Sequence, residues 1–284
     1  MTLEPRGDVP ADVPQPWVCA ACGNSCPGSG RPPEVCPICA DERQWVSPDG
    51  QRWTTLEALR VAGHRSELRE VEPGLTGIGV QPQFAIGQRA LLVSTPEGNL
   101  LWDPPGFVDD EAIQQVADAG GVAALSASHP HFYGAIVEWS RAFDAAVLLP
   151  EADARWLGRS APGLRTWAGS LEVLPGVTLI QCGGHFPGSA VVHWADGAAG
   201  RGVLLSGDTV FVTPGEDRVS FLWSAPNRLP LSERAVRGIV EALRPYPFDR
   251  IYGGWWKPVI REDGRRVLEQ SAHRYIALLG GEEA

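Results

Sequence analysis

The sequence lacks any apolar run that approaches the ~20 residues needed by a membrane-spanning helix. Its first residues, MTLEPRGDVPADVPQP, also lack the apolar core of a secretory signal. We therefore expect neither a membrane protein nor a secreted one, and the predicted location is the reducing cytoplasm. In that compartment cysteines are more often metal ligands or buried thiols than disulfides. Residues 1–16 are predicted to be a disordered, proline-rich lead-in.

Positive charge is scarce. The chain has 24 Lys and Arg residues against 34 Asp and Glu residues, which gives a net charge of −10. A chain this acidic does not attract phosphate backbones over long range, so we expect no nucleic-acid partner. The expected partner is a small-molecule substrate, and the sequence leaves open a homo-oligomer.

The rest of the composition is that of a globular protein. With 284 residues, 44% of them hydrophobic, the chain can form one large domain or two unequal ones. From about residue 73 predicted strands and helices alternate, which indicates α/β layers around a sheet. Strands are predicted at 84–93, 99–102, 122–127, 146–149, 177–181, 190–194, 203–205 and 250–252. Helices are predicted at 110–119, 133–143, 151–156, 231–243 and 264–279, with a short helical turn after a hydroxyl N-cap at Thr54 or Thr55.

Five of the six cysteines lie within residues 17–46. Four of them form two CxxC turns, Cys19-Ala-Ala-Cys22 and Cys36-Pro-Ile-Cys39. Each turn directs two thiolates toward one ion, and two turns complete a tetrahedral site. A segment this short has almost no core of its own, and a metal would stabilise it. Cys26 is expected to be a bystander, and the sequence assigns no role to Cys182.

The stretch from Cys19 to Trp45 resembles the rubredoxin-like knuckle of rubrerythrins. The resemblance includes Gly23 after the second cysteine and the Cys-Pro-x-Cys turn, whereas Ala40 stands where those proteins often have glycine. Sulfur-only sites suit both zinc and iron. We predict structural zinc in this zinc-ribbon-like knuckle, with electron-transferring iron as the alternative.

Histidines are few, but their positions are informative. His129 and His131 follow the predicted strand 122–127, and His185 lies in a glycine-bounded loop after the strand 177–181. Asp208 follows the strand 203–205. Loops at strand ends can converge on one point, and imidazoles with a carboxylate suit zinc or iron(II). His193, on a predicted strand, is expected to be a packed or hydrogen-bonded core residue, and His273 is expected to be exposed.

Four segments in this order resemble the metallo-β-lactamase family. They are Leu100-Leu101-Trp102-Asp103, Ser128-His129-Pro130-His131, Gly184-His185-Phe186-Pro187-Gly188-Ser189 and Ser206-Gly207-Asp208-Thr209. The resemblance covers residues 73–284 and implies a four-layer αβ/βα sandwich with the metal site at one edge. The expected organisation is then a lead-in (1–16), a four-cysteine knuckle (17–46), a connector (47–72) and a metallo-β-lactamase-like domain (73–284).

The sequence departs from the family pattern His-x-His-x-Asp-His. Tyr133 occupies the Asp position, Gly134 the last His position, and Trp255 stands near the family's late histidine. Since these groups build the family's second metal site, the resemblance implies a single ion, zinc or iron, held by the three histidines and Asp208. It also implies that Asp103 supports the histidine loop, with formation of the turn before Pro104 as the alternative.

The predicted activity is metal-dependent hydrolysis of a small ester, thioester, lactone or amide. Asp208 would be a ligand or a proton acceptor, Tyr133 would donate to a developing oxyanion, and Lys257 would pair with a substrate carboxylate. The residues predicted to form an aromatic substrate wall are Trp223, Tyr252, Trp255 and Trp256. Two alternatives remain: an iron oxidoreductase resembling persulfide dioxygenases, using His129, His185 and Asp208, and a non-catalytic metal-binding scaffold.

Overall fold

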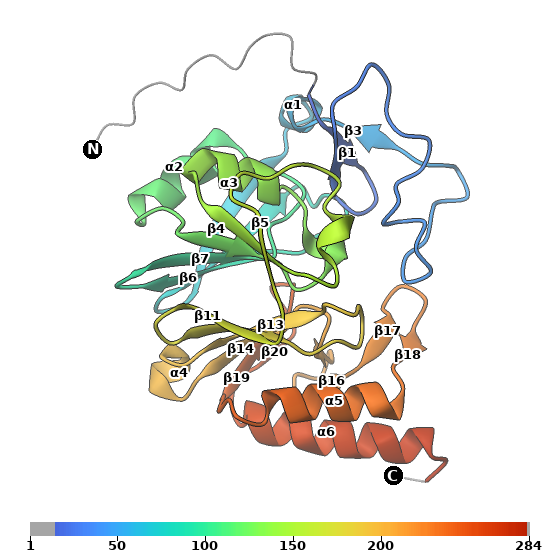
Figure 1. Ribbon diagram of the computed structural model, residues 1–284, viewed down its shortest axis with the longest axis vertical. Helices are drawn as coiled ribbons and strands as arrows, with labels where there is room; N and C mark the ends of the chain where they lie inside the picture. Colours follow the sequence, from blue (N-terminus) through green and yellow to red (C-terminus); the bar gives the residue numbers. More distant parts are fainter. Residues whose placement is uncertain (1–14, 283–284) are drawn as a thin grey trace.

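Two mixed β-sheets lie face to face at the centre of the protein (Figure 1). The computed structural model describes residues 15–282, so the predicted lead-in lies almost entirely outside the described residues. The first sheet has the strand order β10-β9-β8-β7-β6-β5-β4. Its strands are β4 (Arg65–Glu72), β5 (Leu75–Gln81), β6 (Ala90–Thr95), β7 (Gly98–Trp102), β8 (Ala124–Ser126), β9 (Ala146–Pro150) and β10 (Arg165–Trp167).

The second sheet has the order β11-β12-β13-β14-β19-β20. Its strands are β11 (Ser170–Leu174), β12 (Val177–Gln181), β13 (Ala190–Trp194), β14 (Val203–Leu205), β19 (Arg250–Tyr252) and β20 (Val259–Ile260). Shorter elements are α4 (Gly197–Gly200), β15 (Phe211–Val212), β16 (Val219–Ser220), β17 (Leu222–Ser224), β18 (Leu229–Pro230) and the 3-10 turns η1 (Pro130–Phe132) and η2 (Ala154–Trp156).

Helices cover the outer face of each sheet. α2 (Asp110–Asp118) and α3 (Ile136–Phe143) cover the first sheet, whereas α5 (Glu233–Leu243) and α6 (Gly264–Leu279) cover the second (Figure 1). The predicted four-layer αβ/βα arrangement is therefore confirmed. Within residues 15–282, no helix combines the length and the apolar character needed to cross a bilayer.

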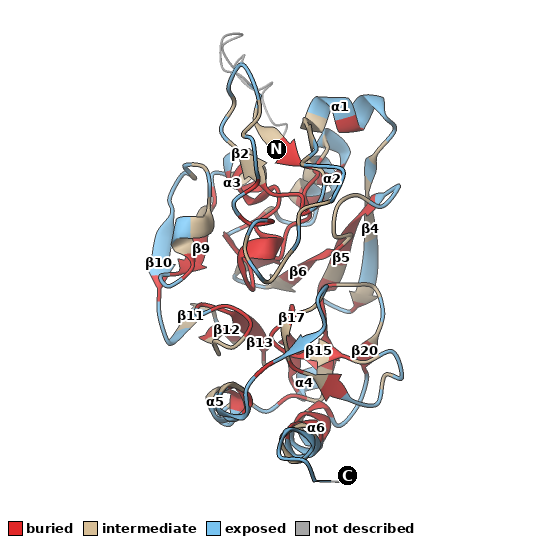
Figure 2. Cartoon of the chain, turned by 90° about the vertical axis from the view of Figure 1, so that its right-hand side faces the viewer, coloured by how far each residue is buried: buried red, intermediate tan, exposed pale blue. Residues whose placement is uncertain are grey.

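Three apolar clusters hold the layers together, one between the sheets and one under each helix pair. Figure 2 shows this burial as red strands and helix faces directed inward. Strands such as β9 and β14 are buried on both faces, which explains why their sequences are continuously apolar rather than alternating. Each fully buried Leu, Ile or Val side chain contributes roughly 1.5–3 kcal/mol to folding.

Side-chain caps define where several helices begin. Thr55 accepts a hydrogen bond from the Ala58 amide at the start of α1 (Leu56–Val61), and Ser232 accepts one from the Ala235 amide at the start of α5. Both caps agree with the sequence. α2 begins at a cap that the sequence analysis did not identify, the Asp109 carboxylate, which accepts from the Ala112 amide at 2.9 Å.

Three predicted elements need correction. The strand expected at 84–93 is β6, which begins only at Ala90, because Ala85 and Gly87 take positive φ angles in a turn. The helix expected at 151–156 is reduced to η2, since the Glu151 amide instead bonds the Trp167 carbonyl. The helix expected at 133–143 begins at Ile136, after the positive φ of Gly134.

The knuckle carries a small sheet with the order β2-β1-β3, formed by β1 (Trp17–Cys19), β2 (Ser25–Cys26) and β3 (Trp53–Thr54). β3 comes from the expected connector, and so does β4, which pairs antiparallel with β5 along its whole length. The connector thus contributes a strand to each of two sheets.

Glu72, at the end of β4, ties the two central sheets together. Its carboxylate accepts hydrogen bonds from the Ala198 amide (2.9 Å) and the Tyr252 hydroxyl (2.8 Å), and it pairs with Arg250. Both Arg250 and Tyr252 belong to β19 of the second sheet. A buried carboxylate is stable when all its contacts are to donors, as here.

Replacing Glu72 with Gln should lower the free energy of unfolding by about 1–3 kcal/mol, because the Arg250 guanidinium loses its charged partner. Urea unfolding measures this change. The matched control is Glu70→Gln on the same strand, which is exposed and should change stability by less than about 0.5 kcal/mol. Equal effects of the two substitutions would show that the tie between the sheets does not stabilise the fold.

Candidate metal centres

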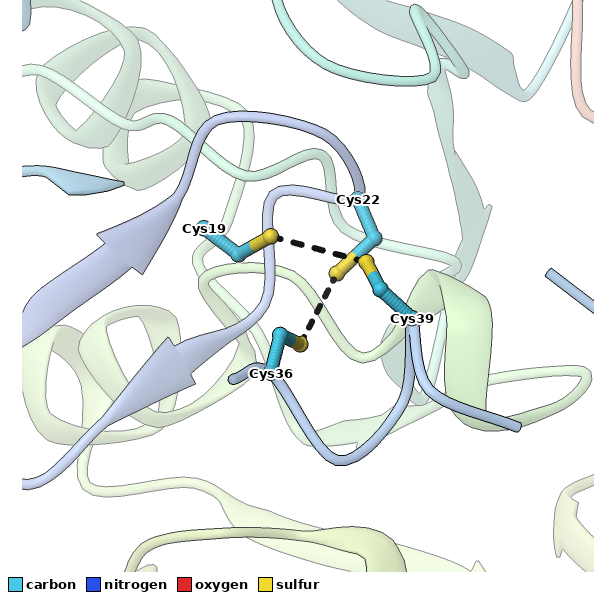
Figure 3. A group of neighbouring side chains, drawn as sticks. All are labelled: Cys19, Cys22, Cys36 and Cys39. Carbon is cyan, nitrogen blue, oxygen red and sulfur yellow. Dashed lines mark hydrogen bonds between the residues drawn. The ribbon is translucent and has the colours of Figure 1, made fainter. Parts of the chain in front are cut away.

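The four knuckle cysteines point toward one another (Figure 3). Their sulfurs all lie within 4.8 Å of one another, with 3.6 Å between Cys19 and Cys39 and 3.7 Å between Cys22 and Cys36. Two sulfurs that are each 2.3 Å from a tetrahedral zinc ion would be about 3.8 Å apart. The cluster therefore has the size and the ligand chemistry of a metal site with four thiolate ligands.

Two amide side chains donate to the sulfurs of this cluster. Gln51 Nε2 lies 3.1 Å from Cys19 Sγ, and Asn24 Nδ2 lies 3.4 Å from Cys22 Sγ. Hydrogen bonds from Cys22 and the other cluster thiols lower the pKa of Cys19 well below its ordinary value. Donors around a thiolate favour its charged, metal-binding form. Cys26 lies outside this group, and burial raises the pKa of its thiol to about 11.

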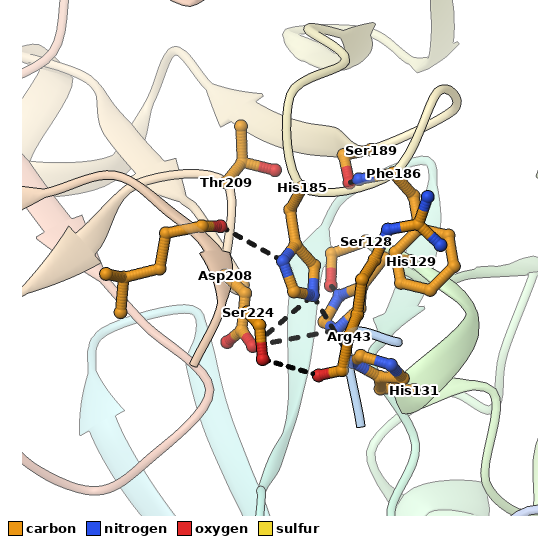
Figure 4. A network of polar contacts seen from close by, with 12 residues as sticks. Arg43, Ser128, His129, His131, His185, Phe186, Ser189, Asp208, Thr209 and Ser224 are labelled. Atoms are coloured by element: carbon orange, nitrogen blue, oxygen red, sulfur yellow. Dashed lines mark hydrogen bonds and ion pairs between the residues drawn. The ribbon is translucent and has the colours of Figure 1, made fainter. Parts of the chain in front are cut away.

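The second cluster joins His129, His131, His185 and Asp208 (Figure 4). One ligand atom from each residue lies within 4.8 Å of all the others. The separation is 3.3 Å between His185 Nε2 and His131 Nδ1, and 3.7 and 3.9 Å from Asp208 Oδ2 to His129 Nε2 and His185 Nε2. Nitrogens bound to one tetrahedral zinc are about 3.4 Å apart. The structure therefore brings together all four predicted residues at distances that suit one ion.

Neighbouring groups set the orientation of two of the imidazoles. Ser128 Oγ lies 2.8 Å from His129 Nδ1, and the Leu222 carbonyl accepts from His185 Nδ1 at 3.1 Å. The Nε2 lone pair of His185 is therefore free to face the cluster. His129 Nε2 and Asp208 Oδ1 are buried without any hydrogen-bond partner among the described residues. A buried ring nitrogen without a partner is costly, and a cation coordinated between the imidazoles and Asp208 Oδ2 would satisfy His129 Nε2.

Burial also sets the protonation of this cluster. It is the main cause that lowers the pKa of His129 and of His131 well below 6.5, with the other imidazoles adding to the effect. Burial likewise lowers the pKa of His185 to about 4 and raises the pKa of Asp208 to about 7. Neutral imidazole is the form that binds metals, so the environment keeps the three histidines ready as ligands.

Asp103 and Ser128 connect the end of β7 to the histidine loop. The Asp103 carboxylate accepts from the Ser128 amide at 2.6 Å, and Ser128 in turn contacts His129. Asp103 also has a positive φ of 56°, so it both turns the chain and holds the loop. The two roles that the sequence left as alternatives coexist in one residue. Burial raises the pKa of Asp103 to about 8.

Sequence reasoning missed three residues that position the centre. Asp153 accepts from the Gly188 amide at 2.8 Å and so holds the His185 loop. Asn24 of the knuckle donates to the His131 carbonyl at 3.1 Å while it also contacts Cys22, so a single side chain touches both centres. Arg43, also from the knuckle, lies over the Phe186 ring beside His185 (Figure 4). No local motif marks these residues, because their partners are distant in the sequence.

The positions that depart from the family pattern are filled by packing. A Cβ atom on Gly134, which has a φ of 45°, would lie 2.1 Å from the Pro104 carbonyl oxygen, so no histidine fits there. Tyr133 is buried, and its hydroxyl donates to the Asp153 carbonyl at 3.0 Å. The predicted oxyanion role of Tyr133 is therefore wrong, since its donor is already used. Trp255 packs edge-on against Phe132, the neighbour of His131 in the chain.

The predicted aromatic wall is only partly formed. Tyr252 is wrongly assigned to it, because this residue lies in the core between the sheets and bonds Glu72. Trp256 is also wrongly assigned: its ring covers Gly77 and Gly79 of β5, where any Cβ atom would collide with it. Lys257 is exposed and forms no ion pair within residues 15–282. Trp223 does border a groove beside Gly184, next to His185.

Replacing Gly134 with Ala should lower the free energy of unfolding by about 2–4 kcal/mol, because overpacking against Pro104 adds to the strain of a positive φ. The matched control is Gly169→Ala, which has a φ of 71° but open space around it and should cost only about 1 kcal/mol. Thermal unfolding of both variants measures the difference. Equal costs would mean that the space beside Gly134 is not closed.

Comparison with known proteins agrees with this geometry. The family model of the metallo-beta-lactamase superfamily matches residues 85–255. The uncharacterized protein YmaE of Bacillus subtilis (strain 168) is 40% identical over 268 residues, which cover 94% of this chain and 97% of YmaE.

Solved structures show the same fold. The DIM-1 metallo-beta-lactamase is similar with a TM-score of 0.56 at 10% identity, over 76% of this chain and 98% of that one. A metallo-beta-lactamase of Cronobacter sakazakii is similar with a TM-score of 0.51 at 15% identity, over 76% of this chain and 94% of that one. With the family model spanning more than half of the sequence, the chain belongs to the metallo-beta-lactamase superfamily.

Proposed function

We propose that this protein is a hydrolase that uses a single metal ion in the histidine centre, with a structural zinc ion in the cysteine knuckle. The observation that carries the proposal is the convergence of four ligand atoms within 4.8 Å, at a buried point where His129 Nε2 and Asp208 Oδ1 have no other partner among the described residues. The superfamily relationship supports hydrolysis in general. The substrate would be a small ester, thioester, lactone or amide.

Zinc is the ion that the histidine centre suits best. Three neutral imidazoles and one carboxylate form a set that zinc binds in tetrahedral or five-coordinate geometry. When bound, such an ion supplies Lewis acidity that activates water and polarises a carbonyl group. Gly134 and Trp255 stand where the family pattern has ligands of a second metal ion, and neither can be a ligand. This supports a single metal ion in the histidine centre.

The residues of the chain have separate tasks in this proposal. Asp208 presents Oδ2 to the imidazoles and leaves Oδ1 without a partner in the described part of the chain, so Oδ1 can accept the proton of the attacking water. Ser128 and the Leu222 carbonyl keep His129 and His185 in their ligand orientation. A groove of about 630 Å³ passes Gly184 and Trp223, and we assign it to the body of the substrate.

The iron oxidoreductase alternative is less well supported. It needs two histidines and one carboxylate with open positions, and His131 would then be spare. His131 Nδ1 instead faces His185 Nε2 at 3.3 Å, within the same cluster. A scaffold with metal in the knuckle alone would leave His129 Nε2 and Asp208 Oδ1 buried without a partner among the described residues.

Replacing His185 with Ala should remove the metal from the histidine centre and leave the knuckle filled, because the two centres share no ligand. Elemental analysis should fall from about two ions per chain to about one. His273→Ala, on an exposed part of α6, is the matched control and should keep both ions. Retention of both ions by the His185 variant would contradict the ligand set.

Hydrolysis should depend on the ion in the histidine centre. Chelation should lower the turnover of 4-nitrophenyl acetate, a thioester or a lactone by at least about 100-fold, because a Lewis acid supplies several kcal/mol and each ~1.4 kcal/mol is a factor of ten. One equivalent of zinc returned to the centre should restore the rate in the wild type but not in the His185 variant. If turnover returns with iron(II) and not with zinc, the hydrolase proposal stands but the assignment of zinc to the histidine centre is wrong.

A further inference from the structure

The cysteine knuckle reaches into the histidine centre through the short segment from Asp41 to Gln44. Three hydrogen bonds hold its main chain on the hairpin of β17 and β18. Ser224 Oγ donates to the Arg43 carbonyl at 2.9 Å, and Asn227 Nδ2 donates to the carbonyls of Glu42 (3.2 Å) and Gln44 (3.4 Å). These residues are more than 180 positions apart, so the contact is a fixed feature of the tertiary structure.

Two aromatic rings of the main domain hold the Arg43 side chain. Its guanidinium carbon lies 4.1 Å from the centroid of the Phe186 ring and 5.2 Å from that of Trp223. Phe186 follows His185 in the chain, and its ring centroid is 4.9 Å from that of His131. Figure 4 shows the Arg43 side chain running alongside the three histidines. The Arg43 guanidinium, which is paired with Asp41, therefore lies beside the histidine centre and against Trp223, a residue that lines the groove.

The hydrogen-bonding capacity of this guanidinium is not exhausted. Asp41 binds it through Nη1 alone, with both carboxylate oxygens at 2.8 Å. Arg43 Nε is buried and has no hydrogen-bond partner within residues 15–282. An arginine presents its donors as a planar fork that matches a carboxylate, and an unpaired buried donor calls for an acceptor. Contacts with the two rings and with Asp41 already restrict the guanidinium, so it loses little freedom when an anion binds.

We propose that Arg43 is a specificity-determining residue that binds a carboxylate of the substrate, so that the cysteine knuckle supplies part of the substrate site. This inference rests on the proposed hydrolase function of the histidine centre. The sequence suggested Lys257 for this role. Arg43 replaces it, because Lys257 is exposed whereas Arg43 packs on Phe186, next to the predicted metal ligand His185. It also gives the knuckle a task besides its own folding.

The test compares two small thiols that differ in one group, 3-mercaptopropionate with a carboxylate and 2-mercaptoethanol with a hydroxyl. Both thiols would bind the metal ion through sulfur, but only 3-mercaptopropionate has a carboxylate that Arg43 could bind. Calorimetry on the full-length, zinc-loaded protein measures both affinities, with His185→Ala defining binding away from the histidine centre. Arg43→Ala should lower the affinity for 3-mercaptopropionate by about tenfold or more and change the affinity for 2-mercaptoethanol by less than about twofold.

Control variants make the result specific. Arg31→Ala removes an exposed arginine of the same knuckle and should change neither affinity. Arg43→Lys keeps the charge and should retain part of the preference for the carboxylate. If Arg43→Ala loses either metal ion, Arg43→Gln keeps the side-chain stem and replaces it in the comparison.

Several outcomes would overturn the inference. If Arg43→Ala lowers the affinities for both thiols equally, Arg43 has a merely structural role. If it lowers neither affinity, Arg43 does not contact the carboxylate. Loss of the preference in Lys257→Ala instead of Arg43→Ala would return the role to Lys257. Each of these leaves the hydrolase proposal intact, whereas failure of both thiols to bind a wild type that holds two ions would remove both proposals.

Discussion

Burial of unpaired ligand atoms at the edge of the two sheets is the constraint on which the rest of the structure depends. Three imidazoles and one carboxylate meet where β8, β12 and β14 end, and their ligand atoms lie within 4.8 Å of one another. Without a cation, His129 Nε2 and Asp208 Oδ1 would have no hydrogen-bond partner among the described residues, which proteins rarely tolerate for buried polar atoms. The loops that carry them are accordingly held by neighbours, since Asp103 binds Ser128 and Asp153 binds Gly188. The fold uses several buried carboxylate and hydroxyl groups to keep one point preorganised.

The knuckle is part of this arrangement. Asn24 contacts both a knuckle sulfur and the main chain of His131, and Arg43 lies against Phe186 beside His185. A short cysteine-rich segment has little apolar surface to bury, so an ion bound by the four cysteines would give it a defined shape. Once shaped, it can present a charged side chain at a fixed place on the main domain. The two centres therefore share no ligands and still meet through the side chains that surround each of them.

The departures from the family pattern have a common physical reason. At Gly134 the main chain passes so close to Pro104 that no side chain fits, and Trp255 fills the neighbouring space by packing on Phe132. Tyr133 uses its hydroxyl to bond the Asp153 carbonyl, which strengthens the support of the His185 loop. The side chains that the family pattern would place at these positions are replaced here by packing and loop support.

Much of this protein follows from the sequence alone, because the relevant signals are local. The two CxxC turns each lie in one short stretch, and the His-Pro-His segment and Asp208 each follow a predicted strand. The predicted bounds of β12, β13, β14, β19 and α6 match the structure to the residue. Contacts between distant segments could be decided only by the tertiary structure. Nothing in the sequence near Gly77 and Gly79 indicates that Trp256 packs on them. Nothing near Glu72 indicates that this residue joins the two sheets. Arg43 looks like any surface arginine until the topology sets it beside residues more than 140 positions away. The residues that serve as ligands can be recognised from the short motifs around them. The side chains that surround each ligand depend on how the layers of the fold pack together.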